Sequence, residues 1–249
     1  MKKEIMTVTS VKKIADETYE MVLKNDYISE NAIPGQFLHI SIPNFTLRRP
    51  ISIADIDRES ETVTIIYKRV GEGTDALTKF SSGMQVDVLG PSGEGFPIDA
   101  TISTALLIGG GVGIPPLYFL AKQLKEKGVQ VNAILGFQTK AGIFYEEKFK
   151  QLTNTFITTD DGSYGEKGLV TTVIPMIDSF ERYYSCGPLP MMKAVKDSIQ
   201  NVEGYLSFEE RMGCGVGTCL ACVIPTNDEQ GYKKICQDGP VFRANEVII

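Results

Sequence analysis

Four of the five cysteines in this sequence stand close together near its end. Cys214, Cys219 and Cys222 follow the spacing C-x4-C-x2-C, and Cys236 comes a little later. Thiolates suit iron, and this spacing is typical of a plant-type [2Fe-2S] site. Gly213, Gly215 and Gly217 stand around the first of these cysteines. The loop can therefore fold tightly and aim backbone N–H groups at sulfur. The pattern predicts that the four cysteines ligate iron and that the fifth, Cys186, is dispensable for it.

Structural zinc is the alternative for these cysteines. Zinc modules usually offer two C-x2-C pairs, and this chain has one. The segment after residue 207 is also too short for a hydrophobic core of its own. We therefore expect it to fold around a metal centre and against the rest of the chain.

Two motifs in the first third of the chain suit a flavin nucleotide. In Arg48-Arg49-Pro50-Ile51-Ser52, a guanidinium can bind a pyrophosphate in bidentate fashion, and backbone groups beyond the proline can meet the edge of an isoalloxazine ring. The glycine turn 70–74 precedes a helical pattern over 75–80, and such a turn suits a phosphate. The alternatives are a solvated strand edge for the first motif and an N-capping turn, with Thr74 as the cap, for the second.

A glycine-rich loop at 109–113 follows an apolar strand pattern over 104–108 and precedes a helix, which is the setting for pyrophosphate binding. The loop departs from G-x-G-x-x-G because Ile114 or Pro116 stands at the last glycine position, and no acidic residue closes the next strand. The ribose must therefore bind elsewhere at the same sheet edge, or these segments are ordinary turns with a buried thiol. The predicted nucleotide contacts are Gly110, Gly111, Gly113, Asp160, Asp161, Cys186, Gly187 and Pro188.

The sequence has one histidine, His39, so no site in this chain can need two. It lies in the alternating segment 36–42, which is typical of a strand. This position favours a structural, hydrogen-bonded histidine over a catalytic one.

The elements that must position these residues fall into two patterns. Up to about residue 100, short alternating segments over 5–14, 19–23, 36–42, 63–68 and 85–89 predict an antiparallel barrel. After Pro97, strand patterns over 104–108, 129–135, 155–159 and 182–185 alternate with helical patterns over 117–124, 145–152, 169–177 and 190–199. This alternation predicts a parallel sheet with helices on its faces.

The order of these motifs resembles the ferredoxin-NADP reductase superfamily. With the cysteine-rich segment added, the whole chain is similar to the electron transfer subunits of dihydroorotate dehydrogenase B. The resemblance implies a multidomain α+β fold: an FAD-binding β-barrel over 1–100, an NAD-binding α/β domain over 101–206 and a [2Fe-2S] module over 207–249. It also implies an FMN-containing catalytic subunit as partner, in a heterotetramer of two of each chain, working in de novo pyrimidine (UMP) biosynthesis.

The resemblance also assigns residues by position. A related bifurcating transhydrogenase subunit shares the three modules but has a non-cysteine first ligand, so Cys214 favours the dihydroorotate family. Four cysteines hold the cluster in this assignment. The residues implied for FAD are Arg49, Pro50, Ile51, Ser52, Ile66, Tyr67, Lys68, Gly73 and Thr74.

These modules predict an oxidoreductase that carries electrons from an FMN partner through the cluster and FAD to NAD⁺, with no residue needed as acid or base. An NADH-dependent reductase that feeds an oxygenase or ferredoxin is the alternative enzyme, and a zinc-containing binding module is the non-enzymatic one. Asp160 and Asp161 stand where NADP-using members of the superfamily carry hydroxyl and basic side chains. Because carboxylates repel a 2′-phosphate, we expect NAD(H) to be preferred.

Composition excludes other classes of protein. Lys and Arg number 25 against 31 Asp and Glu, giving a net charge of −6, and no basic run points to nucleic acid or anionic membranes. No apolar stretch of about 20 residues and no signal-like block are present, so we expect a cytoplasmic protein. Met212, Val216 and Leu220 form an apolar rim for the partner if they are exposed; alternatively, they pack the small module.

Overall fold

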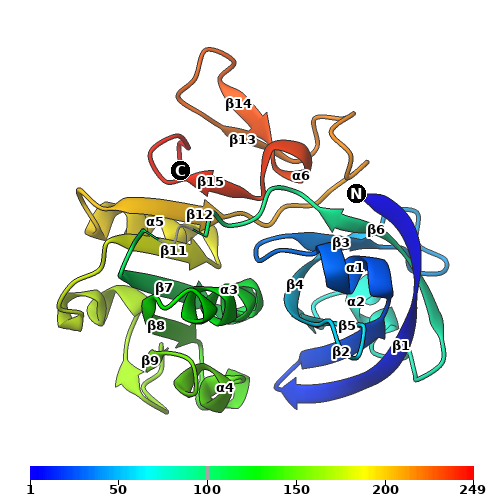
Figure 1. Cartoon of the computed structure of the whole chain (residues 1–249), viewed down its shortest axis with the longest axis horizontal. Helices are drawn as coiled ribbons and strands as arrows, with labels where there is room; N and C mark the ends of the chain where they lie inside the picture. Colours follow the sequence, from blue (N-terminus) through cyan, green and yellow to red (C-terminus); the bar gives the residue numbers. More distant parts are fainter. Residues whose placement is uncertain (99–100) are drawn as a thin grey trace.

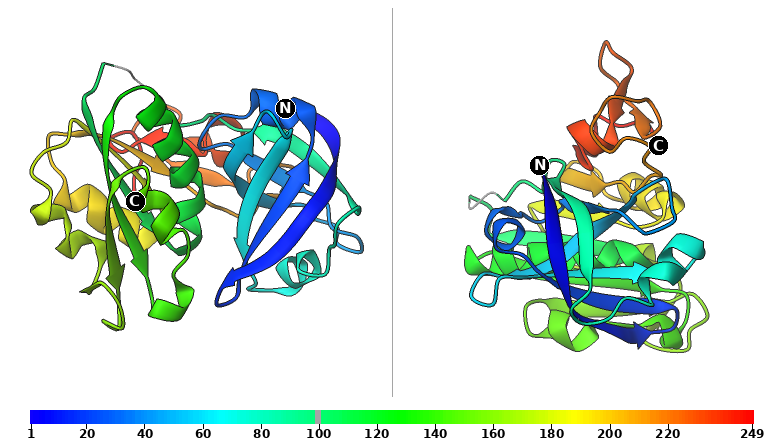
Figure 2. Two further views of the ribbon diagram at one scale, coloured as in Figure 1. Left: turned by 60° about the horizontal axis from the view of Figure 1, so that its bottom comes forward. Right: turned by 90° about the vertical axis from the view of Figure 1, so that its right-hand side faces the viewer.

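The computed structural model describes residues 1–98 and 101–249. The domain boundary expected between residues 100 and 101 falls at the two residues outside these ranges. Figure 1 shows a barrel and a sheet with helices on its faces side by side, with a smaller third part lying over both. Figure 2 shows that part of this third region projects away from the body of the molecule.

The N-terminal part is a closed antiparallel barrel with the strand order β1-β2-β5-β4-β3-β6. The prediction of a barrel is confirmed. Its interior is filled by alternate apolar side chains such as Met6, Leu38 and Ile65, all fully buried. The elements are β1 (Lys2–Ala15), β2 (Thr18–Lys24), α1 (Asp26–Asn31), β3 (Phe37–Ile40), β4 (Arg49–Asp57), β5 (Thr62–Lys68), α2 (Glu72–Leu77) and β6 (Gln85–Ser92).

The second part is a seven-stranded sheet with the order β10-β9-β8-β7-β11-β12-β15, parallel except at β15. Its elements are β7 (Thr104–Gly110), η1 (Gly111–Gly113), α3 (Ile114–Glu126), β8 (Gln130–Phe137), η2 (Lys140–Gly142), α4 (Glu146–Lys150), β9 (Asn154–Thr159), β10 (Glu166–Lys167), η3 (Val170–Thr172), η4 (Ile174–Met176), β11 (Arg182–Cys186), α5 (Leu189–Ser198), β12 (Glu203–Ser207) and β15 (Val241–Arg243).

The central strand β7 is buried on both faces. Ala105 and Leu107 belong to the core on the α3 side, whereas Leu106 and Ile108 belong to the core on the α5 side. Successive side chains of a strand point to opposite faces, so a continuous apolar run needs cover on both. The predicted parallel sheet with helices on its faces is confirmed.

The helix predicted over 169–177 is wrong. The structure has two 3-10 turns there, η3 and η4. Pro175 lacks the N–H that a continuous helix needs, and the run Thr171-Thr172-Val173 is β-branched, which lowers helix propensity. The regularly spaced apolar side chains of this segment therefore pack two short turns, and not a helix, against the sheet.

The segment after β12 forms the third part. It holds β13 (Val223–Pro225), β14 (Tyr232–Lys234) and α6 (Ile235–Asp238), and then returns to the sheet as β15. Cys222, Ile224 and Cys236 pack into the same core as Leu206 and Phe242 of the sheet. As expected from its length, the segment has no separate core.

Helix α3 contacts both the sheet and the barrel. Phe119 of this helix packs into the barrel core, and Lys122 pairs with Asp55 of β4 at 2.5 Å. Tyr145, just before α4, donates to the Glu20 carboxylate of β2 at 2.5 Å. These contacts hold the barrel and the nucleotide sheet in one arrangement.

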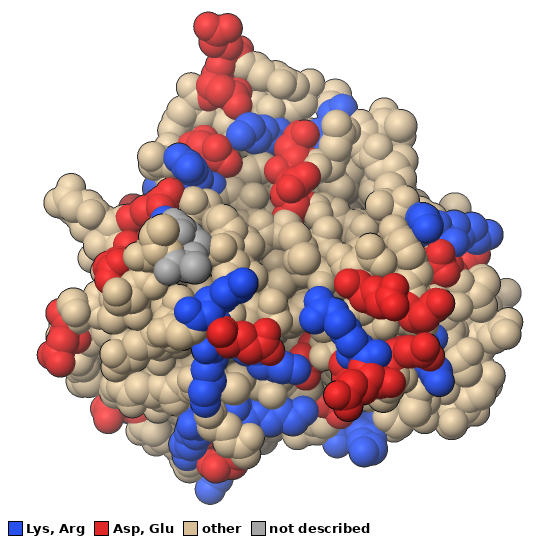
Figure 3. Space-filling model, viewed as in Figure 1, with Lys and Arg blue, Asp and Glu red and all other residues tan. Residues whose placement is uncertain are grey.

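Over the face shown in Figure 3, acidic and basic side chains are intermixed. Among the described residues, no helix combines the length and apolar character that crossing a membrane requires.

Candidate functional site

A cavity of about 630 Å³ opens between the barrel and the carboxyl edge of the parallel sheet. Ligands of open α/β sheets bind at this edge. Most of the predicted nucleotide residues line the cavity: Gly110, Gly111, Gly113, Asp160, Gly187 and Pro188.

The glycine loop lets backbone groups come close to this cavity. A Cβ on Gly113 would overlap the carbonyl oxygen of Cys186, so only glycine fits where the loop crosses the end of β11. Helix α3 begins directly after it, with Pro115 and Pro116 in its first turn. Prolines fit there because the first N–H groups of a helix have no intrahelical partner, and the free N–H groups can bind an anion.

Two of the predicted nucleotide residues do not line the cavity. Asp161 is exposed, and its carboxylate accepts from Ser163 through both N–H and hydroxyl. These hydrogen bonds lower the pKa of Asp161. Cys186 is fully buried, and burial raises the pKa of its thiol. Their roles as nucleotide contacts stay predictions, and Asp160 is the acidic residue that reaches the cavity.

A second cavity, of about 230 Å³, lies against strands β4 and β5 of the barrel. It gathers most of the residues predicted to contact FAD: Pro50, Ile51, Ser52, Ile66, Tyr67, Lys68 and Thr74. The remaining wall comes largely from residues 208–212 and Pro240, on either side of the cysteine-rich segment.

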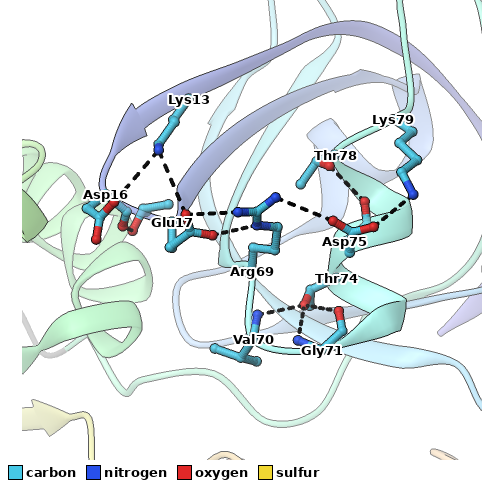
Figure 4. Close-up of polar contacts among 11 residues, drawn as sticks. Lys13, Asp16, Glu17, Arg69, Val70, Gly71, Thr74, Asp75, Thr78 and Lys79 are labelled. Carbon is cyan, nitrogen blue, oxygen red and sulfur yellow. Dashed lines mark hydrogen bonds and ion pairs between the residues drawn. The ribbon is translucent and has the colours of Figure 1, made fainter.

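Arg49 and Gly73 do not line this second cavity, but they contact each other beside it, where Arg49 meets the first turn of α2. A Cβ on Gly73 would lie 2.6 Å from Arg49 Nε, so the guanidinium rests on the bare backbone of the turn. Thr74 accepts from the backbone N–H groups of Val70 and Gly71 at 3.0 and 3.2 Å, as Figure 4 shows. Gly71, not Thr74, is therefore the N-cap of α2, and the Thr74 hydroxyl braces the first turn from inside the helix. Contact of Thr74 with phosphate stays a prediction.

The neighbouring Arg69 is engaged elsewhere. It donates to the Glu17 carboxylate and pairs with Asp75 (Figure 4). Among the described residues, Arg49 has no carboxylate partner, and its Nη1 donates only to the Leu47 carbonyl. Arg49 is thus the guanidinium near this turn that can turn toward an anion.

The two cavities adjoin, because Lys68, Val112 and Glu209 line both. The Glu209 side chain is exposed by surface area, but protein packed around its carboxyl group raises its pKa to about 7. Sequence reasoning left Glu209 without a role. The signal that could have found it is its position directly after a strand of the parallel sheet, where side chains reach the ligand edge.

The four late cysteines form two pairs in the structure. Cys214 contacts Cys219, and Cys236 contacts Cys222. The first pair is partly accessible, and the second is buried.

Backbone N–H groups of the loop point at these sulfur atoms. Val216 donates to Cys214 Sγ at 3.4 Å, and Gly217 donates to Cys236 Sγ at 3.2 Å. Hydrogen bonds from Thr218, Val216 and Cys219 lower the pKa of Cys214 to about 5, which favours the thiolate that metals bind.

Two pairs of thiolates suit a binuclear cluster better than a single ion. A zinc site needs its ligands around one centre, whereas each iron of a [2Fe-2S] cluster takes two protein ligands. The donor set and its pairing therefore fit the iron–sulfur cluster.

His39 lies beside this loop, and its ring makes no hydrogen bond of normal geometry among the described residues, although the Arg48 backbone interacts with it. The ring is 1% exposed, and neither ring nitrogen has a hydrogen-bond partner among the described residues. Burial and the nearby Arg48 guanidinium lower the pKa of His39 to about 4, so the imidazole is neutral at physiological pH. Alternation within a strand predicted the position of this residue, but it could not show which part of the chain covers the ring.

Two stretches of the chain match known domain families. Residues 209–248, which hold the four paired cysteines, match the iron-sulfur cluster binding domain of dihydroorotate dehydrogenase B. Residues 107–197 match the oxidoreductase NAD-binding domain.

Relatives that align over the whole chain decide the family. A protein of Bacillus pumilus (strain SAFR-032), named dihydroorotate dehydrogenase B (NAD(+)), electron transfer subunit, is 53% identical over 256 residues, covering 100% of this chain and 99% of the relative. A protein of Geobacillus sp. (strain WCH70) with the same name is 50% identical over 257 residues, covering 100% of each. The chain belongs to the dihydroorotate dehydrogenase B electron transfer subunits. The family expected from the order of motifs is confirmed.

Solved structures agree with this family of electron transfer subunits. An NADH-dependent reduced ferredoxin-NADP oxidoreductase superposes with a TM-score of 0.90 at 32% identity, covering 98% of this chain and 90% of that chain. A ferredoxin NADP⁺ reductase from Neisseria gonorrhoeae, solved with bound FAD and NADP, has a TM-score of 0.67 at 14% identity, covering 80% of this chain and 90% of that chain. The second match shows the fold alone. The expected multidomain fold is confirmed.

Proposed function

We propose that this chain is the electron transfer subunit of a dihydroorotate dehydrogenase, passing electrons from an FMN-containing catalytic subunit through a [2Fe-2S] cluster and FAD to NAD⁺ in pyrimidine biosynthesis. One observation carries the proposal: the three candidate sites lie in series. Met212, two residues before Cys214, lines the second cavity, and that cavity shares Lys68 and Glu209 with the first.

The residues around the second cavity suit FAD. We assign Arg49 to the pyrophosphate, because its guanidinium has no carboxylate partner among the described residues and can donate in bidentate fashion. We assign Ser52 and the backbone of Ile66–Lys68 to the ring system, because they line the cavity wall. Thr74 and Gly73 hold the turn on which Arg49 rests.

The residues around the first cavity suit NAD(H). We assign the glycine loop and the start of α3 to the pyrophosphate and Asp160 to ribose hydroxyl groups. Gly187 and Pro188 would form part of the wall around the bound nucleotide. When bound, the flavin supplies the change from one-electron to two-electron transfer, and the protein supplies binding, distance and orientation.

The paired cysteines Cys214, Cys219, Cys222 and Cys236 are assigned to the cluster. We keep 207–249 as the cluster module, with the qualification that β15 belongs to the nucleotide sheet. Residues 1–100 and 101–206 are assigned to FAD and NAD(H), respectively. We also propose a cytoplasmic location, because thiolates awaiting iron stay reduced there.

The docking face for the FMN subunit is proposed at the cysteine loop. Met212 is 4% exposed and packs inside, whereas Val216 and Leu220 are 39% and 61% exposed. The run 212–223 contains no charged residue, so the loop offers an uncharged apolar surface directly over the more accessible cysteine pair. A heterotetramer of two subunits of each kind is the assembly that we propose.

The proposal is tested by comparing the purified chain alone with the chain plus the FMN subunit. A visible spectrum should show flavin and iron–sulfur absorption, and the chain alone should oxidise NADH with artificial acceptors. Dihydroorotate-dependent reduction of NAD⁺ should appear only when the FMN subunit is added, since both described cavities are assigned to the nucleotide cofactors.

Three outcomes would contradict the proposal. A colourless protein that contains zinc would replace the cluster by a structural metal. Dihydroorotate-dependent NAD⁺ reduction by the chain alone would remove the need for a partner. Coupling to an oxygenase or a ferredoxin, but not to the FMN subunit, would support the alternative reductase.

A further inference from the structure

The ring of His39 is a buried polar group without a hydrogen bond of normal geometry among the described residues, although the Arg48 backbone interacts with it. A neutral imidazole carries one N–H donor and one bare nitrogen acceptor. Both nitrogens of His39 are buried without a hydrogen-bond partner. Burying an N–H without an acceptor is unfavourable, so an acceptor at this point would explain why the chain places a histidine here.

The ring lies directly against the cysteine loop. A Cβ on Gly215 would overlap Nδ1 and Cε1 of His39, so that edge of the imidazole touches the loop backbone. Gly215 has a φ of +70° and follows Cys214 in the chain. Glycine is required here both by the backbone conformation and by the close approach of the ring.

The barrel holds the ring in this place. His39 lies in β3, paired with Pro50 of β4, the strand that begins with the motif assigned to the flavin. Pro50 has no N–H, and the His39 carbonyl accepts from Arg48 Nη1 at 3.2 Å. Arg48 is itself fixed by Asp87 at 2.6 Å. The imidazole is therefore attached to the flavin barrel on one side and pressed against the cysteine loop on the other.

We propose that the N–H of His39 donates a hydrogen bond to a sulfur atom of the cluster held by the cysteine loop, and thereby tunes the reduction potential of that cluster. Once the loop holds a cluster, sulfur atoms lie nearby as hydrogen-bond acceptors. Hydrogen bonds to sulfur stabilise the more negative, reduced form and so raise the potential. The inference rests on the proposed cluster at these cysteines.

The chain offers a direct test, because His39 is its only histidine. Protein loaded with its cluster and grown with ¹⁵N-labelled histidine carries the label in this residue alone. Pulsed electron paramagnetic resonance of the reduced cluster should detect a ¹⁵N coupling that is absent from unlabelled protein. A normal cluster signal without this coupling overturns the inference, whereas a protein without any cluster overturns the proposed function instead.

Variants test the effect on the potential. His39→Phe keeps a ring but removes the donor, and we expect its reduced cluster to be destabilised about tenfold, a midpoint lower by about 59 mV for one electron. His39→Asn keeps an N–H and should recover much of this shift. Leu38→Met, on the same strand but in the barrel core, is the matched control and should leave the potential unchanged.

The variants also distinguish tuning from packing. An unchanged potential in a fully loaded His39→Phe protein overturns the inference. If His39→Phe loses iron, retention of iron by His39→Asn supports the donor role, and equal loss in both variants overturns it.

Discussion

The cysteines of this chain differ in what surrounds their sulfur atoms. Cys186 lies at the end of β11 with its side chain fully buried, and burial raises the pKa of its thiol. Cys214 accepts hydrogen bonds that lower its pKa to about 5. Burial also raises the pKa of Cys236, so what separates Cys186 from the four predicted ligands is its position outside the cysteine loop, not its pKa.

Serine replacements test this difference. Cys219→Ser should lose most iron and sulfide, because it removes one thiolate from the accessible pair. Cys186→Ser is the control and should keep the full iron content, since this sulfur lies outside the loop. Iron and sulfide assays check both, and full iron in Cys219→Ser would refute the ligand assignment.

Glu209 gives the chain a predictable dependence on pH. Its pKa is raised to about 7, above the value of 4.5 for an unperturbed glutamate. The folded chain therefore binds more protons than the unfolded chain between these values, so its stability falls as pH rises through this window. In Glu209→Gln this contribution is absent. Between pH 5 and pH 8, the melting temperature of the variant should therefore rise relative to that of the wild type.

The adjacent Glu210→Gln is the matched control, because this carboxylate already accepts from the Arg211 N–H. Its melting temperature should follow the wild-type curve. A Glu209→Gln curve parallel to the wild type across the same pH range would show that the carboxyl group is not held in its protonated form.

At the scale of elements, Arg49 opens β4 directly before Pro50, which lines the second cavity. We expect Arg49→Ala to lose about 1.5 to 3 kcal/mol of flavin binding, the worth of a charge-assisted hydrogen bond. This corresponds to roughly a ten- to more than hundredfold weaker affinity for FAD. Arg69→Ala is the control, because Glu17 and Asp75 occupy its guanidinium.

The flavin-to-protein ratio after dialysis at low FAD measures this effect. Iron content should stay normal in both arginine variants, since neither residue belongs to the cysteine loop. Equal flavin retention by Arg49→Ala and the wild type would show that Arg49 of β4 does not bind the pyrophosphate.

The end of β9 should determine the choice of nicotinamide. Asp160 borders the first cavity, and its carboxylate would repel a 2′-phosphate. We expect kcat/KM for NADH to exceed that for NADPH, and Asp160→Ser to reduce the ratio at least about tenfold. Asp161→Ser should leave the ratio unchanged because Asp161 lies outside the cavity. Comparable values for NADH and NADPH in the wild type would reject this assignment.

The sequence predicts elements whose pattern is local. The glycine loop with α3 and the alternation of β2 and β5 follow from nearby residues. Strand β4 was not among the expected barrel strands because it opens with Arg49-Pro50, although its partners β3 and β5 are its neighbours in sequence. Strand β15 was missed for another reason, since only its pairing with β12 makes three residues a strand.

The site was predictable to the same extent. Spacing alone indicated the cysteine ligands, since their pattern lies within a short segment. Neither the pairing of Asp161 with Ser163 nor the position of Glu209 at both cavities could be inferred, because both depend on how loops fold. The contact between His39 and Gly215 joins residues far apart in sequence, and no local pattern carries it.

At the scale of the whole molecule, the exposed side chains of the cysteine loop should control assembly. We expect the double variant Val216→Asp, Leu220→Asp to bind the FMN subunit at least about tenfold more weakly, because charges would enter an apolar interface. Its own cluster and NADH oxidation should persist. Met176→Asp, at an exposed apolar position on the nucleotide domain, is the control.

Co-purification and dihydroorotate-dependent NAD⁺ reduction measure this assembly. Normal binding by a double variant that keeps its cluster would place the interface elsewhere. Loss of binding in Met176→Asp as well would indicate a general effect of added charge.

The return of β15 to the sheet has a consequence for the lifetime of the protein. Because β12 and β15 are hydrogen-bonded to each other, the chain that carries all four cluster cysteines is a loop closed at its base by backbone pairing. The entropy of bringing those ends together is lost on folding and not on metal uptake. A chain stripped of iron by oxygen would keep its sulfur atoms gathered, so repair needs fresh iron and sulfide and no new round of folding.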